Sequence, residues 1–380
     1  MSNSSRYPLE NVLVMDFTQA FSGPFCTMML ADNGARVIKI EKKITGDMLR
    51  DAGPFDDDHN SLYFASGNRG KESVELDLTD SNDIALVKAI IKDADILVEN
   101  FRPGVMAKLG LSYEDVIKIN PKIIYTSISG FGQTGPRKHE PGFDMIAQGY
   151  SGLMSVNGEL HGKALRVGVS IGDMNGGLFA YMGTMTALYA REKNEKGSHV
   201  DISMTDGLFA LMPPQVANYS NTGKIETTCG NAHPAIAPFG VVATADGEII
   251  ISILGKKLWH AFCDLINRPE IEMDERFKTN ELRLKNRNEF RKIERPILKT
   301  KTSDEWISLF QKAGIPCARI NNIKEACEME QIKARNMLCK AGDYILAGNP
   351  MKMSGYSDDY VKGKIPDLGE HTDKIRNEFK

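Results

Sequence analysis

The sequence predicts an α/β protein in which a larger α/β region precedes a smaller α+β region. Over the first 205 residues, apolar runs of strand length alternate with segments of helical periodicity. Residues 222–238 are polar and rich in turn formers, as in a linker. Beyond them, a hairpin pattern is followed by three helical segments. A chain of 380 residues is also too long for one ordinary core, which favours two domains.

The first elements form a strand, helix, strand unit. Residues 11–16 (N-V-L-V-M-D) are an apolar run, residues 25–33 have helical character, and residues 36–40 (R-V-I-K-I) form a second strand. The first turn carries only Gly23 and Pro24 instead of G-x-G-x-x-G, so a dinucleotide cofactor is not expected. Backbone N–H groups of this turn can still bind a ligand at the helix start.

Four further strands are expected at residues 73–78, 95–99, 123–129 and 198–203. The second is followed by N-F-R-P-G and the third by the glycine-rich loop G-F-G-Q-T-G-P-R. Ligands of open α/β sheets bind beyond the carboxyl ends of the strands, so both loops are candidate ligand sites. The alternative is that they are ordinary turns.

The stretch R-V-G-V-S-I-G-D-M-N-G-G, residues 166–177, is the candidate catalytic segment. Its first half alternates like a strand, and residues 178–191 have helical spacing, so Asp173 falls near a helix start. The positive end of the helix dipole favours a carboxylate there, and an ionised carboxylate can act as a nucleophile. The alternative is that Asp173 only caps the helix.

The smaller region begins with a hairpin over residues 240–254, in which A-D-G separates two β-rich runs. Helices are expected at residues 258–266, 283–298 and 303–313, and a strand at residues 315–320.

Composition points to small-molecule chemistry. The net charge is -3, with 47 basic and 50 acidic residues well mixed, which favours neither a nucleic-acid partner nor a membrane surface. The polar N-terminus has no signal-like core, and no apolar run is long enough for a membrane span. The six cysteines show no metal-ligand spacing, so we expect no metal site and a cytoplasmic protein with reduced thiols.

A series of motifs resembles the family III CoA-transferases, of the formyl-CoA:oxalate and carnitine type. It covers nearly the whole chain in family order, and its members are D-F-T-x4-G-P, G-A-R-V-I-K-I-E, S-L-Y-F, K-E-S-V-E-L-D-L, A-D-I-L-V-E-N-F-R-P-G, S-I-S-G-F-G-Q-T-G-P, I-G-D, D-I-S-M-T-D and L-G-E-H-T. The length and the stretch A-R-N-M-L-x3-G-x5-G-N-P-x-K-x-S-G-Y are most similar to the acetyl-CoA:oxalate members.

The resemblance implies a Rossmann-like large domain and a small α+β domain, arranged as an open-ring subunit that interlocks with a second copy in a homodimer. We therefore expect residues 1–205 to form the N-terminal part of the large domain, residues 206–238 a linker and residues 239–322 the small domain. Residues 323–380 would form the return linker and the C-terminal part of the large domain.

The resemblance also assigns site residues. Asp173 matches the family's nucleophilic aspartate. Apart from the resemblance, Arg137 is a further binding candidate, since with Gly132 and Gly135 it could provide the short, polar pocket that a small dicarboxylate needs. Phe21 replaces a glutamine that lies beside the nucleophile in the formyl-CoA enzyme, and residues 230–234 are the candidate for the active-site lid. The implied contacts of CoA are Ala20, Lys42, Leu76, Leu78, Asn100, Phe101, Lys108 and Met204.

The implied reaction moves CoA from acetyl-CoA, formyl-CoA or succinyl-CoA to a small carboxylate, with oxalate preferred, through an aspartyl anhydride and an aspartyl-CoA thioester. Acyl-CoA is a substrate here, and no permanently bound cofactor is expected. Backbone N–H groups near Gly132 or at the helix start of Asp173 are the expected oxyanion site.

Three alternatives remain open. The first is a transferase for another acid, of the carnitine/crotonobetaine type or for another dicarboxylate. The second is an α-methylacyl-CoA racemase, which needs a histidine where this chain has Phe143, with His139 nearby in a loop. The third is a CoA-binding protein without catalysis, which the presence of Asp173 disfavours.

Overall fold

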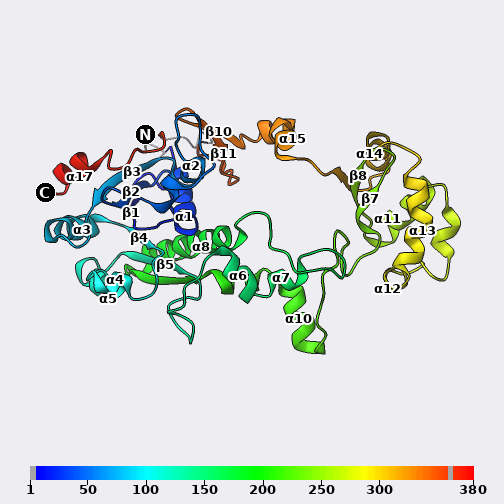
Figure 1. Cartoon of the computed structure of the whole chain (residues 1–380), viewed down its shortest axis with the longest axis horizontal. Helices are drawn as coiled ribbons and strands as arrows, with labels where there is room; N and C mark the ends of the chain where they lie inside the picture. The colour runs from blue at the N-terminus through cyan, green and yellow to red at the C-terminus, as the bar shows by residue number, and fades with distance from the viewer. Residues whose placement is uncertain (1–5, 358–362) are drawn as a thin grey trace. The chain divides into compact units, whose positions relative to one another are not determined.

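The computed structural model describes residues 6–357 and 363–380, so part of the polar N-terminus lies outside the described residues. The chain divides into two units (Figure 1). The large unit contains residues 1–154, 166–225 and 330–380, and the small unit contains residues 155–165 and 226–329. The large unit is therefore built from both ends of the chain.

The large unit is organised around a six-stranded parallel sheet in the order β3-β2-β1-β4-β5-β6. This order reverses direction between β1 and β4, as in doubly wound folds. The prediction of a mixed α/β fold with a parallel sheet is confirmed. The strands are β1 Leu13–Asp16, β2 Arg36–Lys42, β3 Lys71–Leu76, β4 Ile96–Glu99, β5 Ile124–Ser129 and β6 Ser198–Ser203.

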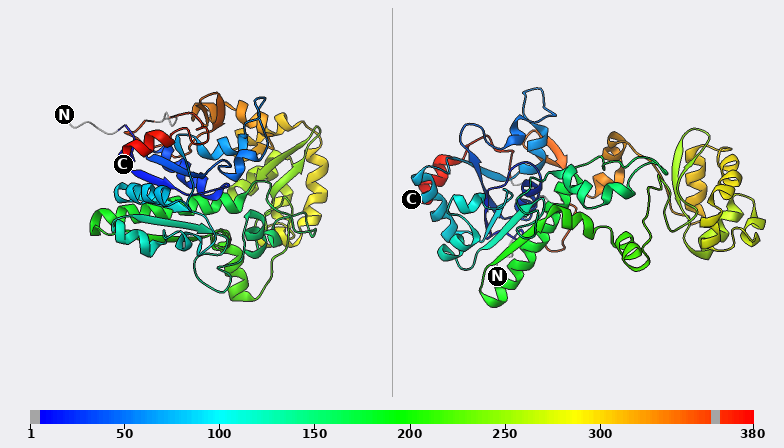
Figure 2. Two further views of the ribbon diagram at one scale, coloured as in Figure 1. Left: turned by 60° about the vertical axis from the view of Figure 1, so that its left-hand side comes forward. Right: turned by 60° about the horizontal axis from the view of Figure 1, so that its bottom comes forward.

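Helices cover both faces of this sheet (Figures 1 and 2). Adjacent strand residues point to opposite faces, so Val14 packs with α1 and α8 while Met15 packs with α3, α5 and α17. Each face buries its own apolar core. The helices that form these two layers are α1 Ser22–Asp32, α8 Ile171–Asn194, α3 Ser81–Asp93, α5 Tyr113–Ile119 and α17 Thr372–Glu378.

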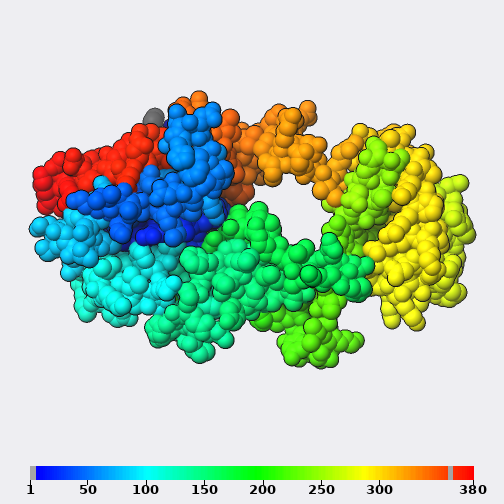
Figure 3. Space-filling model, in the orientation of Figure 1, coloured from blue at the N-terminus to red at the C-terminus, as the bar shows by residue number. Residues whose placement is uncertain are grey.

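Shorter elements complete the large unit. They are η1 Met48–Asp51, α2 Leu62–Asn68, α4 Val105–Lys108, α6 Asp144–Tyr150, α7 Leu153–Val156, α9 Met204–Ala210, α10 Pro213–Thr222, α16 Glu330–Ala334 and the hairpin β10 Leu338–Ala341 with β11 Tyr344–Ala347. The C-terminal residues (red) lie against the N-terminal third of the chain (blue) in Figure 3. There Thr372 Oγ1 accepts a hydrogen bond from the Glu75 N–H, and Arg36 forms an ion pair with Glu378.

The small unit packs helices against a three-stranded antiparallel sheet, β7-β8-β9. Its core is rich in aromatic side chains, including Trp259, Phe262, Phe290, Trp306 and Phe310. Its elements are β7 Phe239–Ala243, β8 Glu248–Ser252, β9 Cys317–Arg319, α11 Gly255–Leu265, η2 Pro269–Met273, α12 Asn280–Lys285, α13 Arg287–Leu298, α14 Ser303–Lys312 and α15 Ile323–Glu328.

Two local predictions differ from the structure. The alternating run before Asp173 is not a strand, because its N–H groups do not bond to a neighbouring strand. The Val167 N–H donates to the side-chain oxygen Oε1 of Gln148, and the Ile171 N–H donates to the Val169 carbonyl. The expected linker over residues 206–238 starts later, since α9 and α10 belong to the large unit through residue 225. Leu208 of α9 is fully buried in the sheet core, which explains why this segment does not act as a linker.

Candidate active site

A cavity of about 280 Å³ lies at the carboxyl edge of the sheet, where the strand order reverses. The loop after β1 and the loop after β4 form two of its walls, and these two strands flank the reversal point. Ligands of open α/β sheets bind in this place. The cavity is lined by Gln19, Ala20, Ser22, Met48, Asn100, Phe101, Arg102, Pro103, Ile128, Ser129, Gly130, Glu140, Pro141, Gly142, Phe143, Asp173 and Met204.

Asn100 fastens the two loops together. Its Oδ1 accepts a hydrogen bond from the Gln19 N–H at 2.8 Å, and its Nδ2 donates to the Gln19 carbonyl at 2.7 Å and to Ser22 Oγ at 3.2 Å. Ala20, between them, has the left-handed φ of 59°, which is unfavourable for a residue with a Cβ. The side chain of Asn100 therefore supports the wall of the cavity as well as lining it.

Asp173 enters the cavity from the first turn of α8. Ser170, the N-cap residue, makes no side-chain capping bond, and the helix start is instead held by Asp144 of α6. Asp144 Oδ1 accepts a hydrogen bond from the Gly172 N–H at 2.7 Å, and its Oδ2 accepts one from Gln148 Nε2 at 2.8 Å. Thus the start of α6 fixes the start of α8 directly beside the candidate nucleophile.

The electrostatic setting of Asp173 differs from the expectation. Burial, together with the nearby negative charge of Asp144, raises the pKa of Asp173 to about 7. We expected the helix start to keep this group fully ionised. Partial removal from water and a like charge act in the opposite direction, so the carboxylate is the minor form below neutral pH.

An aromatic cluster joins the start of α1 to α2 and reaches the start of α8. The Phe21 ring contacts the rings of Phe25 and Tyr63, with centroid distances of 5.7 and 5.1 Å. The Tyr63 hydroxyl lies 3.4 Å from Oγ of Ser170, the N-cap of α8. At Phe21, where the formyl-CoA enzyme has a glutamine, this chain places a hydrocarbon ring.

The structure brings five of the predicted residues together and separates the others from them. Ala20, Asn100, Phe101, Met204 and Asp173 line the cavity. The remaining predicted CoA contacts do not line it: Lys42 is exposed at the end of β2, Leu76 and Leu78 pack in the sheet core, and Lys108 is exposed on α4. Lys42 and Leu76 do end β2 and β3 at the same edge of the sheet.

Arg137 is also outside the cavity lining, because its guanidinium is used locally. It forms a 2.8 Å ion pair with Glu140, donates to the Tyr150 hydroxyl at 3.0 Å and lies over the Tyr150 ring. Glu140 lines the cavity. Arg137 therefore holds a residue of the wall.

Two residues of the site were missed by the sequence interpretation. Arg102, within N-F-R-P-G, is the only basic side chain among the described residues that line the cavity. Asp144, within P-G-F-D-M, holds the start of α8. The position of Arg102 directly after β4 could have indicated it, whereas the role of Asp144 depends on a contact with a residue 28 positions away.

Two of the expected oxyanion donors are already engaged. The Gly132 N–H donates to Ser129 Oγ at 2.9 Å, and the Gly172 N–H donates to Asp144. At the start of α8, the N–H of Asp173 itself has no acceptor among residues 6–357 and 363–380. This N–H is the available donor at the helix start.

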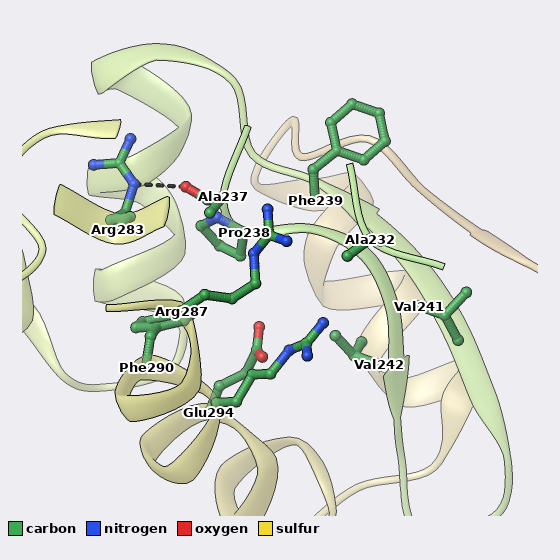
Figure 4. A pocket seen from close by; sticks show the side chains of 12 residues that line it. Ala232, Ala237, Pro238, Phe239, Val241, Val242, Arg283, Arg287, Phe290 and Glu294 are labelled. Carbon is green, nitrogen blue, oxygen red and sulfur yellow. Dashed lines mark hydrogen bonds between the residues drawn. The ribbon is translucent and has the colours of Figure 1, made fainter. Parts of the chain in front are cut away.

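The candidate lid, residues 230–234, belongs to the small unit and is tied to its helices. Arg287 Nη2 donates to the His233 carbonyl at 2.6 Å, and the His233 ring stacks on Phe239. Farther along, Arg283 Nε donates to the Ala237 carbonyl at 2.6 Å, drawn as the dashed line in Figure 4. The assignment of this segment as a lid stays a prediction.

The pocket in Figure 4 lies between this segment and α13, and both Arg287 and Glu294 point into it. Burial raises the pKa of Glu294 to about 7, although Arg291 and Arg295 lower it in part. Its Oε1 atom is buried and has no hydrogen-bond partner among the described residues. This pocket belongs to the small unit and is separate from the cavity of Asp173.

Within the described ranges, no three or more His, Cys, Asp or Glu side chains are grouped so that they could hold a metal ion. No helix in those ranges is both long and apolar enough to cross a bilayer. All six cysteines are free thiols.

Comparison with known proteins defines the class. The family model described as CoA-transferase family III matches residues 9–372. The chain is 43% identical to the acetyl-CoA:oxalate CoA-transferase of Acetobacter aceti, over 98% of this chain and 96% of that protein. It is 36% identical to the succinyl-CoA:glutarate CoA-transferase of Mus musculus, over 98% of this chain and 87% of that protein.

Solved structures agree with this result. A CAIB/BAIF family protein from Brucella suis is 32% identical and superposes with a TM-score of 0.88, covering 99% of this chain and 100% of the other. An α/β fold with a cavity at the strand ends and a carboxylate at a helix start is compatible with an enzyme that acts on a small-molecule substrate. The chain belongs to CoA-transferase family III and is a CoA-transferase that uses CoA thioesters as substrates.

Proposed function

We propose that this enzyme transfers CoA from a short acyl-CoA, such as acetyl-CoA, formyl-CoA or succinyl-CoA, to oxalate, with Asp173 as the nucleophile. The observation that carries the proposal is the position of Asp173 in one cavity with Ala20, Asn100, Phe101 and Met204. The family resemblance assigns these four residues to CoA binding.

The first half of the reaction releases the donor acid. The Asp173 carboxylate attacks the thioester carbonyl, the C–S bond breaks, and a mixed anhydride and CoA thiolate form. The thiolate then attacks the Asp173 carbonyl of the anhydride. This step forms an aspartyl-CoA thioester and expels the donor as a carboxylate.

The second half runs the same steps in reverse order. The acceptor carboxylate attacks the aspartyl-CoA carbonyl, which gives a new mixed anhydride and CoA thiolate. The thiolate attacks the acceptor carbonyl, so acceptor-CoA leaves and the Asp173 carboxylate is regenerated. Every bond broken is replaced by an equivalent bond, so the reaction consumes no ATP.

The surroundings of Asp173 suit this sequence. The partial burial of the carboxyl weakens its hydration, which makes the ionised form more reactive and limits hydrolysis of an anhydride. The free Asp173 N–H is one donor for the oxyanions that form at the thioester or anhydride carbonyl. Asp144 keeps these groups in place through the Gly172 N–H.

The choice of oxalate rests on the 43% identity to a relative named for oxalate. A relative named for glutarate, at 36% identity, makes a longer dicarboxylate the second candidate. An acceptor screen with all three donors tests the choice. We expect oxalyl-CoA to form fastest, and a failure of oxalate with every donor would overturn the acceptor while leaving the class of enzyme intact.

Racemase chemistry is disfavoured because no histidine lines the described part of the cavity, where Phe143 is present and His139 is absent from the lining. Binding without catalysis is tested by Asp173→Ala. We expect this variant to bind CoA but to lose CoA exchange. Substantial residual exchange would remove Asp173 from the mechanism.

We also propose a homodimer, interlocked as in the resemblance. Its support is a row of exposed apolar side chains along α8, namely Leu178, Met182 and Tyr189, which are 43%, 49% and 64% exposed. Because they repeat after four and seven residues, they share one face of the helix. An apolar face of this kind favours burial against a partner.

A further inference from the structure

The loop after β1, which lines the cavity, is held in place by a buried ion pair that has no role in the transfer steps. Lys39, in the middle of β2, and Asp47, just before η1, form an ion pair of 2.9 Å in which both side chains are fully buried. Lys39 Nζ also donates to the Thr18 carbonyl at 2.7 Å. A buried ion pair commonly adds little to stability compared with a pair of apolar side chains, so stability alone does not explain its presence here.

Asp47 connects this pair to two walls of the cavity. Its Oδ1 accepts hydrogen bonds from the Ala20 N–H at 3.1 Å and from the Leu49 N–H at 3.0 Å. Ala20 lines the cavity, and so does Met48, the residue between Asp47 and Leu49. One carboxylate therefore joins the loop after β1 to the start of η1.

The loop needs such an anchor because its conformation is unfavourable by itself. Ala20 has a left-handed φ of 59°, and a residue with a Cβ occupies that region only when its surroundings enforce it. Asn100 holds the neighbouring Gln19, and Lys39 holds Thr18. The hydrogen bond to Asp47 fixes the N–H of Ala20 itself.

We propose that Asp47, held by Lys39, is a positioning residue for acyl-CoA binding, and that it fixes the Ala20 loop and the start of η1 as one rigid wall. This inference rests on the proposed function of the cavity. Asp47 touches no substrate in this account and acts only through the backbone of Ala20 and Leu49.

The first test is Asp47→Asn. An amide of the same shape can accept hydrogen bonds through only one oxygen, so the variant loses either the Lys39 contact or the Ala20 contact. We expect the dissociation constant for CoA and the KM for acyl-CoA to rise roughly tenfold, because the Ala20 loop and the start of η1 are no longer fixed before CoA binds. We expect kcat to change little, since the reacting groups are not altered.

The matched control is Asp32→Asn. Asp32 forms an equally buried 2.7 Å pair with Arg69 in the same unit, and neither residue lines the cavity. The control should lose thermal stability to a similar degree, yet its dissociation constant for CoA should match that of the native enzyme. An equal rise in the control would show that the effect is general destabilisation and would overturn the proposal.

A second variant covers the case in which Asp47→Asn does not fold. Asp47→Glu keeps the charge for Lys39 but moves the carboxylate away from the Ala20 N–H by one methylene. We expect a folded protein by near-UV circular dichroism with weakened CoA binding. If either variant folds and binds CoA as tightly as the unaltered enzyme, the role of Asp47 is contradicted. If the unaltered enzyme itself does not bind CoA, the proposed function of the cavity is contradicted instead.

Discussion

Asp173 experiences two opposing influences at the scale of a single residue. Its place in the first turn of α8 favours the negative charge, while burial and Asp144 favour the neutral acid. The second influence is larger, because the pKa of Asp173 is raised to about 7. A nucleophile with this pKa is weakly hydrated and still available at neutral pH.

The pH profile should report this balance. Only the ionised carboxylate attacks, so kcat/KM should fall about tenfold per pH unit below a pKa near 7 and level off above it. Asp144→Asn removes the neighbouring negative charge and should move this acidic limb to lower pH. Steady-state rates across neutral pH measure both curves.

Glu140→Gln is the control for that shift. It also removes a carboxylate from the cavity lining, but Glu140 does not contribute to the raised pKa of Asp173. Its acidic limb should coincide with that of the native enzyme. An unmoved limb in Asp144→Asn would contradict the role given to Asp144.

Arg102 should matter more for substrate binding than Lys108. Arg102 lines the cavity, and among the described residues no ion pair or hydrogen bond occupies its guanidinium, whereas Lys108 is exposed outside the lining. Loss of a charge-assisted contact predicts a rise of roughly tenfold in one KM for Arg102→Gln. Lys108→Gln should leave both KM values within about twofold.

The two KM values of Arg102→Gln carry further information. A higher KM for acyl-CoA would assign the guanidinium to the phosphates of CoA, and a higher KM for the acid would assign it to the acceptor carboxylate. If neither KM changes, Arg102 has no part in binding.

Asp173 could be proposed as the nucleophile from the sequence because the signals are local: glycines, a helical repeat and the I-G-D motif all lie within a few residues. Asp144 could not, because its effect comes from a bond between two helix starts. Asp47 could not be found from the sequence for the same reason, because its role depends on contacts with Ala20 and Lys39 in other segments of the fold. Side-chain networks between distant segments leave little trace in local patterns.

At the scale of elements, the close approach of α1 and α8 sets the position of Asp173. A Cβ on Gly177 would lie 2.6 Å from the Ser22 carbonyl oxygen and 3.1 Å from the Phe25 ring. The Ser22 carbonyl is part of the backbone and cannot move aside as a flexible side chain would. The two helices can therefore approach this closely only with glycine at position 177. Gly177 follows Asp173 by one turn of the same helix.

Gly177→Ala should therefore lower both stability and activity. The added methyl forces α8 away from α1, which we expect to cost about 1–3 kcal/mol and to displace Asp173. Gly149→Ala in α6 is the opposite case, because its Cβ would meet nothing within 4 Å. Alanine favours helix there by up to about 1 kcal/mol.

Thermal melting distinguishes the two variants directly. We expect a lower melting temperature with a lower kcat for Gly177→Ala, and an unchanged or higher melting temperature for Gly149→Ala. Full activity in a stable Gly177→Ala enzyme would show that the helix contact does not position the nucleophile.

The strands were predicted within two residues of their observed ends, since each is a short apolar run closed by turn residues. The run before Asp173 had the same period without becoming a strand. Its N–H groups meet Gln148 and nearby carbonyls instead of a neighbouring strand. Periodicity shows which residues are apolar, but a partner strand decides whether a sheet forms.

At the scale of the whole molecule, the division into a large and a small unit follows from composition and length, but its boundaries do not. The resemblance placed residues 206–222 in the linker, yet α9 buries Leu208 in the core of the large unit. The small unit also recruits residues 155–165, far ahead of its main segment. The grouping of residues 155–165 with a segment far along the chain depends on tertiary contacts, which local composition does not reveal.

The proposed dimer is tested by Met182→Glu. A carboxylate in the exposed apolar row of α8 should weaken association, so light scattering should find the mass of one chain instead of two. Ala85→Glu adds the same charge at an exposed site on α3 and should leave the dimer intact. A native enzyme that is monomeric would contradict the proposal.

The central claim, that Asp173 carries CoA during transfer, is most directly tested by mass spectrometry of the enzyme trapped after mixing with acetyl-CoA and no acceptor. We predict that the peptide containing Asp173 gains CoA through a thioester and that addition of oxalate discharges it. CoA attached to a different residue, or continued transfer by Asp173→Ala, would contradict the account.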